Sequence, residues 1–132
     1  MTVKMGEEGE SLLPGTVYLA PDLLHMGVSE DLRVVLSDAP AINGCKPSAT
    51  FLFNSVAVFG AGVLAVIMTG GGDDGIAGLH AVKKAGGHVW VQDERSSVIF
   101  GMPAKAIEAG LAELAIPLDA IAPRIREVLR HE

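Results

Sequence analysis

The sequence predicts an α/β protein with a doubly wound, mostly parallel sheet, helices on both faces and an antiparallel hairpin near the N-terminus. Residues 63–68 (VLAVIM) form an unbroken apolar run, which is typical of a strand buried on both faces. A glycine-rich turn follows, and apolar residues then recur at every third position, as in an amphipathic helix: Ile76, Leu79 and Val82. From Pro47 onward helical and strand patterns alternate, and this order requires parallel strands joined by right-handed crossovers.

Four short strands are predicted before residue 47, at residues 2–5, 16–20, 25–28 and 33–36. The last two flank the short polar segment Ser29-Glu30-Asp31, so we expect them to pair as a hairpin at one edge of the sheet. Residues 37–46 are expected to form a loop, because Asp, Pro, Asn and Gly interrupt regular structure there.

The first predicted helix opens at Pro47 and Ser48, and glycines at positions 60 and 62 end it. Its apolar face consists of Leu52, Val56 and Phe59. The later predicted elements are strand 63–68, a helix from residue 76 that stops at Gly86-Gly87, strand 88–91, helix 104–109, strand 111–116 and helix 119–130. Asp119 is the expected N-cap of the last helix, and Pro123 is expected to make its start irregular.

Composition limits the class of protein. The 132 residues suffice for one domain with a substantial core but not for two. Although 49% of the residues are hydrophobic, no apolar run approaches the roughly 18 residues of a membrane span, and residues 1–10 lack a secretion-signal pattern. The net charge of −6, without a basic cluster, argues against nucleic acid and anionic membranes. Cys45 is the only cysteine, which excludes an internal disulfide and a cysteine-rich metal site. We expect a cytoplasmic protein that does not insert into a membrane.

The glycine turn allows a dinucleotide-binding interpretation. Gly70 to Gly75 matches G-x-G-x-x-G between a strand and a helix, and Asp93 and Glu94 follow about 20 residues later. However, Asp73 and Asp74 lie where the start of the helix would receive a pyrophosphate, and two carboxylates repel it. No Lys-Ser or Lys-Thr follows the glycines, which argues against a P-loop. Dinucleotide binding is therefore kept as an alternative function.

The same turn fits part of a Ser-His-Asp triad. An acid at a helix start caps free N–H groups, and a well-held carboxylate is also what a catalytic histidine needs on its far nitrogen. The glycines leave backbone N–H groups unshielded for an oxyanion. No G-x-S-x-G turn supplies a nucleophile, and Ser96 and Ser97 are expected to cap. The four histidines lack metal-ligand spacing, and we expect neither metal nor cofactor: His25, His80, His88 and His131.

Specific motifs indicate a family. Residues 66–110 carry a strand, T-G-x-G-x-D-G-x-x-G-L, a helix ending A-G, a strand ending Q-D-E, and then S-S-V-x-F-G-M-P. Upstream, LLPGTVYLAP with His25 and KPSATFLFNSVA follow in the same order. Over nearly its whole length the chain resembles the C-terminal half of the catalytic domain of CheB, the chemotaxis receptor protein-glutamate methylesterase.

The resemblance implies an esterase that hydrolyses methyl-glutamate on methyl-accepting chemotaxis receptors and deamidates glutamines there. Asp74 corresponds to the triad aspartate, the backbone N–H of Gly71 to an oxyanion donor, and Met102 to a substrate-contacting position. No cofactor is implied. The family usually has methionine where Gly71 stands; the backbone donor survives this change, but the side-chain wall does not.

The resemblance also implies that residues 1–132 are only the C-terminal part of the domain. The family's serine, in G-A-S-T-G-G, and its histidine, in Q-H-M, belong to a segment before these motifs, and so does the receiver domain. We therefore expect the isolated chain to be inactive, and to form a homodimer or to be completed by the missing half-domain. The rival hypothesis is a non-catalytic α/β module that binds receptors.

Overall fold

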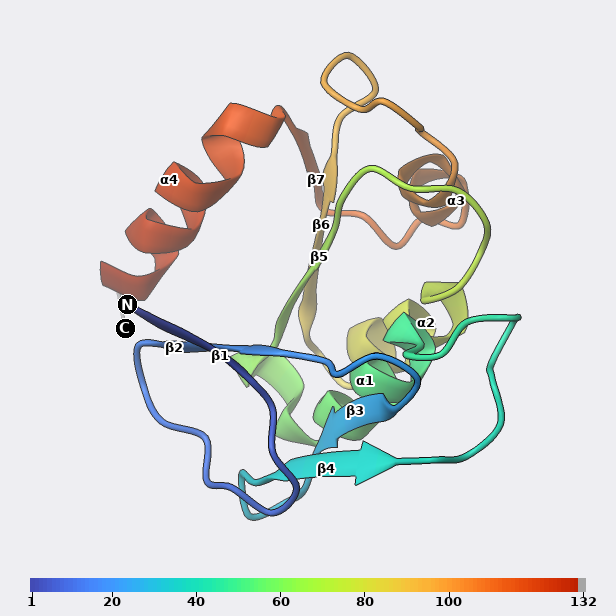
Figure 1. The fold of residues 1–132 in the computed structure, drawn as a ribbon. Coiled ribbons are helices and arrows are strands. Elements are labelled where there is room, and N and C mark those ends of the chain that lie inside the picture. The colour runs from blue at the N-terminus through green and yellow to red at the C-terminus, as the bar shows by residue number, and fades with distance from the viewer. Residues whose placement is uncertain (131–132) are drawn as a thin grey trace.

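The computed structural model describes residues 1–130, which form three small sheets with helices around them (Figure 1). The strands are β1 (Thr2–Met5), β2 (Thr16–Leu19), β3 (His25–Val28), β4 (Val34–Ser37), β5 (Leu64–Ile67), β6 (His88–Gln92) and β7 (Leu114–Ile116). The helices are α1 (Ala49–Val56), the 3₁₀ helix η1 (Ala57–Gly62), α2 (Ile76–Lys84), α3 (Met102–Glu108) and α4 (Leu118–Arg130). Within residues 1–130, no helix is both long and apolar enough to cross a membrane.

The largest sheet has the order β5-β6-β7, and all of its pairings are parallel. One face packs against α1, α2 and α3, with fully buried Leu79, Val82, Val89 and Val91 at its centre. The opposite face packs against α4, where Ile121 meets the strand residues Trp90 and Ile116. In Figure 1, α4 lies on one side of the strands, and α2 and α3 lie on the other. The predicted α/β fold with helices on both faces is confirmed.

Glycines fix both ends and the packing of α2. Gly75, at φ 99°, precedes the helix, and Gly86, at φ 95°, follows it; L side chains rarely adopt either conformation. The Gly86 N–H donates to Lys83 O and so satisfies a carbonyl of the last turn. A Cβ on Gly78 would lie only 2.6 Å from the Cβ of Phe53, so glycine at this position lets α1 and α2 pack closely.

The N-terminal third forms two separate two-stranded sheets. β1 pairs with β2 in parallel, and β3 pairs with β4 in the predicted antiparallel hairpin. The expectation that the hairpin lies at an edge of the main sheet is wrong, because β3 packs against α1 instead. The N–H of Val28 donates to Ser55 Oγ of α1 at 3.0 Å, and a Cβ on Gly27 would lie 2.8 Å from that oxygen.

Several element boundaries differ from the predictions. The first helix turns into η1 after Val56, and Gly60, with φ 56° and ψ −126°, makes a kink there. α3 begins at Met102, two residues before the predicted start. Asp119 lies inside the first turn of α4 rather than at its cap, and Pro123 lies within the helix. His131 lies outside the described residues.

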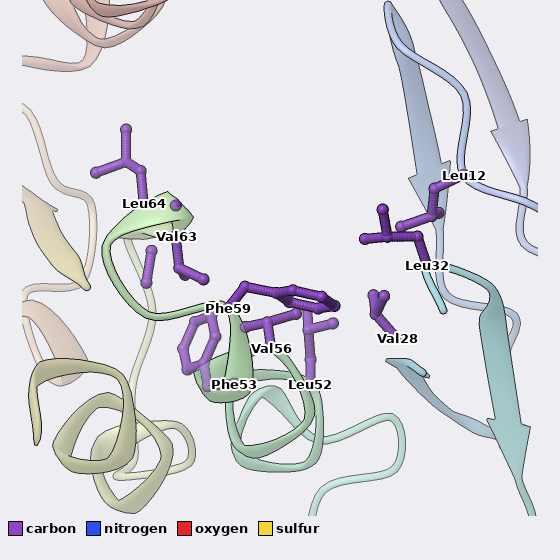
Figure 2. Close-up of a pocket in the computed structure, with 11 residues that line it drawn as sticks. Leu12, Val28, Leu32, Leu52, Phe53, Val56, Phe59, Val63 and Leu64 are labelled. Carbon is purple, nitrogen blue, oxygen red and sulfur yellow. The ribbon is translucent and has the colours of Figure 1, made fainter. Parts of the chain in front are cut away.

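β5 ends the parallel sheet and, among the described residues, its ladder partner is β6 alone. Beside it lies an apolar pocket of about 630 Å³. In Figure 2, Leu12 and Leu32 of the N-terminal region face Phe59, Val63 and Leu64 across open space. The free edge of β5 therefore adjoins an apolar hollow between the two parts of the chain.

Candidate functional site

Asp74 lies in the turn after β5, and its side chain is 7% exposed. Ser48 Oγ donates to Asp74 Oδ1 at 2.5 Å, and the backbone N–H of Ala49 donates to Oδ2 at 2.7 Å. The capping role expected for one of the two aspartates thus belongs to Asp74, but on α1 rather than on its own helix. Asp73 is exposed and lines a shallow hollow together with His80 and other residues.

A second contact ties the same turn to α1. The N–H of Gly75 donates to Thr50 Oγ1 at 2.8 Å. Ser48, the N-cap of α1, accepts from the Thr50 N–H at 3.1 Å. The start of α1 and the glycine turn therefore bind each other through side chains and backbone in both directions, although they lie about 25 residues apart in sequence.

Gly71 is exposed at the tip of the turn. Its neighbour Gly70 is anchored, because its N–H donates to Ile99 O at 2.9 Å and its carbonyl accepts from the N–H groups of Gly101 and Met102. Within residues 1–130, the Gly71 N–H has no recorded protein acceptor. A held backbone with a free N–H is the arrangement that an oxyanion donor needs.

The loop after β6 supports the turn from the other side. Gln92, which is 1% exposed, accepts from the Thr69 N–H at 2.8 Å and donates to Ser96 O at 2.8 Å. The hydroxyl and the N–H of Ser96 both donate to Asp93 Oδ1, and they lower the pKa of Asp93 below its ordinary value. The Ser97 hydroxyl donates to Asp93 O. The expected capping role fits Ser96, whose Oγ also accepts from the N–H of Leu118 at the start of α4 at 3.0 Å, whereas Ser97 stabilises the loop as a donor and caps no helix within residues 1–130.

His25 is fully buried beside the site. Its Nδ1 accepts from the Ser48 N–H at 3.1 Å, and its Nε2 donates to Pro40 O at 2.9 Å. Its ring is stacked on Phe51 with the centroids 4.8 Å apart. Both ring nitrogens therefore bind backbone groups. His25 contacts the backbone of Ser48, and its ring nitrogens make no hydrogen bond to Asp74. His88 lies elsewhere, against Glu113.

The sequence predicts a role for Asp74 but not its contact with Ser48. It predicts Ser48 to open a helix and assigns no role in the site to His25. The available signal was the Pro-Ser pair before an apolar helical pattern, which predicts an N-cap. The contact with Asp74 spans 26 residues and depends on the packing of α1 against α2, which local patterns do not encode. Within the described residues, no group of three His, Cys, Asp or Glu side chains is arranged to hold a metal ion.

The fold and this corner define a doubly wound α/β protein whose candidate site lies beyond the carboxyl end of a parallel strand. The chain belongs to the CheB methylesterase family, whose family model matches residues 1–125. The resemblance predicted from the sequence is confirmed.

Individual relatives agree with this assignment. The chain is 52% identical over 131 residues to the "Protein-glutamate methylesterase/protein-glutamine glutaminase of group 3 operon" of Rhizobium meliloti (strain 1021), covering 98% of this chain and 37% of that protein. A Myxococcus xanthus (strain DK1622) protein, "Protein-glutamate methylesterase/protein-glutamine glutaminase 4", is 47% identical with the same coverage. The crystal structure of the Thermotoga maritima CheB methylesterase catalytic domain matches with a TM-score of 0.91 at 34% identity, covering 95% of this chain and 68% of that one. The chain thus spans a little over a third of the length of these curated relatives.

Proposed function

We propose that residues 1–132 are the C-terminal part of a catalytic domain that hydrolyses protein-glutamate methyl esters and deamidates protein glutamines on chemotaxis receptors. The observation that carries this proposal is the Asp74 carboxylate, buried and held by two donors in the turn after β5, together with the exposed Gly71 of the same turn, whose N–H donates to no protein group within residues 1–130. Such an enzyme works in the cytoplasm on the cytoplasmic part of the receptor.

In the completed domain, a serine oxygen attacks the ester carbonyl while a histidine takes the serine proton. Asp74 accepts a hydrogen bond from the far nitrogen of that histidine and so fixes its tautomer. The Gly71 N–H donates to the oxyanion, and the histidine returns the proton to the departing methoxide, which leaves as methanol. Water then cleaves the acyl-serine bond by the same route; from a glutamine substrate the group that leaves is ammonia. Met102, half-buried at the start of α3, contacts the substrate.

The serine and the histidine come from the part of the domain that this chain does not span. Two observations support this step. Both nitrogens of His25 are occupied by backbone groups, and the Ser48 hydroxyl donates to Asp74, so these side chains are not free to form a nucleophile–base pair. In addition, β5 offers an unpaired edge beside an apolar pocket, a suitable position for further strands (Figure 2).

The test compares two proteins. The first is the 132-residue chain alone; the second, called the joined enzyme below, is this chain preceded by the N-terminal part of the catalytic domain of the Rhizobium meliloti relative. Methanol release from methylated receptor is expected only from the joined enzyme. Turnover by the chain alone would contradict the division of the triad, and an inactive but folded joined enzyme would contradict the esterase function.

The same experiment addresses the rival function, a receptor-binding module without catalysis. The observation that favours it is that His25 and Ser48 are engaged internally and form no nucleophile–base pair. A joined enzyme that binds receptor but releases neither methanol nor ammonia would favour it. Activity of the joined enzyme would argue against it.

A further inference from the structure

A chain of hydrogen bonds runs from the loop after β4 through His25 and Ser48 to Asp74. Pro40 O accepts from His25 Nε2, His25 Nδ1 accepts from the Ser48 N–H, and Ser48 Oγ donates to Asp74 Oδ1. The Ser48 N–H can only donate, so Nδ1 must be the unprotonated nitrogen and Nε2 must carry the hydrogen. His25, Ser48 and Asp74 are 0%, 3% and 7% exposed, so water has little access to the two bonds that join them.

The carboxylate of Asp74 is bound at both oxygens by adjacent residues. Ser48 Oγ reaches Oδ1, and the Ala49 N–H reaches Oδ2. Ser48 Oγ also accepts from the Thr50 N–H, which fixes the direction of its own hydrogen. Two donors that are rigidly linked through one backbone set the plane of the carboxylate as well as its position.

His25 and its surroundings hold Ser48 in turn. The imidazole is stacked on Phe51 with only 15° between the ring planes, so it has little freedom to rotate. Gly27, two residues further along β3, lets the strand lie against α1, because a Cβ there would be 3.1 Å from the ring of Phe51. The hairpin thus fixes the ring, and the ring fixes the backbone of Ser48.

We infer that Ser48 is a positioning residue that sets the orientation of the Asp74 carboxylate, and that His25 holds Ser48 in place. The inference rests on the proposed function, in which Asp74 must keep one oxygen within hydrogen-bond distance of the triad histidine. A displacement of about 1 Å at such a contact can reduce the rate by about 100-fold.

The test uses three variants of the joined enzyme. Ser48→Ala is expected to lower kcat by about 10- to 100-fold with KM changed by less than about twofold, since a contact that acts in the transition state is lost. Ser48→Thr keeps the hydroxyl and is expected to restore most of the loss. Ser55→Ala, on the same helix, removes a hydroxyl that binds Val28 N–H and Leu52 O but not Asp74, and is expected to leave kcat within about twofold.

A second measurement does not depend on activity. In the 132-residue chain, hydrogen exchange at the Ala49 amide reports its bond to Asp74. Ser48→Ala is expected to speed this exchange by about 10-fold or more, and Ser55→Ala is expected to leave it unchanged. An active joined enzyme whose kcat survives Ser48→Ala, or unchanged exchange at Ala49, would overturn the positioning role. If the joined enzyme itself is inactive, the proposed function fails, and the Ala49 exchange still decides whether Ser48 holds Asp74.

Discussion

The β1-β2 sheet and the β5-β6-β7 sheet both carry apolar strand residues but cover them very differently. In the β5-β6-β7 sheet the inward side chains Val89 and Val91 are fully buried under helices. In the β1-β2 sheet, by contrast, Val3 pairs with Val17 and Met5 pairs with Leu19, yet all four are exposed. An isolated two-stranded sheet is at best marginally stable in water. The N-terminal strands therefore present an exposed apolar face, and we expect another layer to cover it in the joined enzyme.

The candidate site lies away from the exposed β1-β2 sheet. Asp74 and Gly71 belong to the turn after β5, whereas His25 belongs to the β3–β4 hairpin, where it is fully buried. Ser48 lies between them at the start of α1 and binds both His25 and Asp74. In the proposed positioning role, the orientation of the acid therefore depends on a buried part of the N-terminal region and not on its exposed sheet.

The largest expected effect separates the two aspartates of the turn. In the joined enzyme, Asp74→Asn is expected to lower kcat by about 10⁴-fold, because an amide no longer holds the triad histidine in the required tautomer. Asp73→Asn is expected to change kcat by less than about tenfold, since Asp73 is exposed and the bond from the start of α1 goes to Asp74 instead. Methanol release under saturating methylated receptor measures both.

Equal losses of kcat in the two variants would contradict the separate roles given to Asp73 and Asp74. If Asp73→Asn reduced kcat as much as Asp74→Asn, the shared negative charge of the turn would matter rather than the oriented carboxylate. The division of labour between a capping acid and an exposed one would then be wrong.

The uncovered region predicts a change in assembly. With its apolar face and the free edge of β5 exposed, the isolated chain is expected to self-associate, as a homodimer, at micromolar concentration. The joined enzyme should be monomeric, because its added strands cover the same surfaces. Sedimentation velocity decides this. An isolated chain that stays monomeric with a cooperative melt would mean that the half-domain closes its own core.

A stability measurement probes the covered region. Gly78→Ala is expected to destabilise the chain by about 1–3 kcal/mol, because its Cβ would lie 2.6 Å from that of Phe53 and 3.0 Å from Thr50 Cα, which pushes α1 away from α2. Gly62→Ala, where a Cβ would meet nothing within 4 Å, is the control and is expected to stay within about 0.5 kcal/mol. Urea unfolding of both variants tests the prediction, and equal midpoints would contradict it.

The sequence predicts features within single elements better than contacts between elements. The parallel sheet was predictable because the run 63–68 and the three-residue period after Ile76 are signals within single elements. Asp74 and Gly71 could be proposed from the sequence because they lie in one short motif. The contacts of His25 and Ser48 could not be predicted, since they form where separate elements meet. The hairpin was predicted. Its packing against α1 was not, because it depends on the absence of a Cβ at Gly27, and the spacing of apolar residues carries no information about that contact.

The smallest expected effect concerns the loop after β6 and its dependence on pH. Hydrogen bonds from Ser96 lower the pKa of Asp93 in the folded chain, with a smaller contribution from the charge of Arg95. A carboxyl whose folded pKa lies below its unfolded one stabilises the fold above the unfolded value, about 4, and this contribution is lost as the pH falls through the folded value. Asp93→Asn should therefore lower Tm slightly at pH 7, and the deficit should shrink toward about pH 2.5. Glu94→Gln, at an exposed neighbour, is the control and should show little deficit at either pH. A deficit for Asp93→Asn that stays constant with pH would mean that the loop depends on the shape of the side chain and not on its charge.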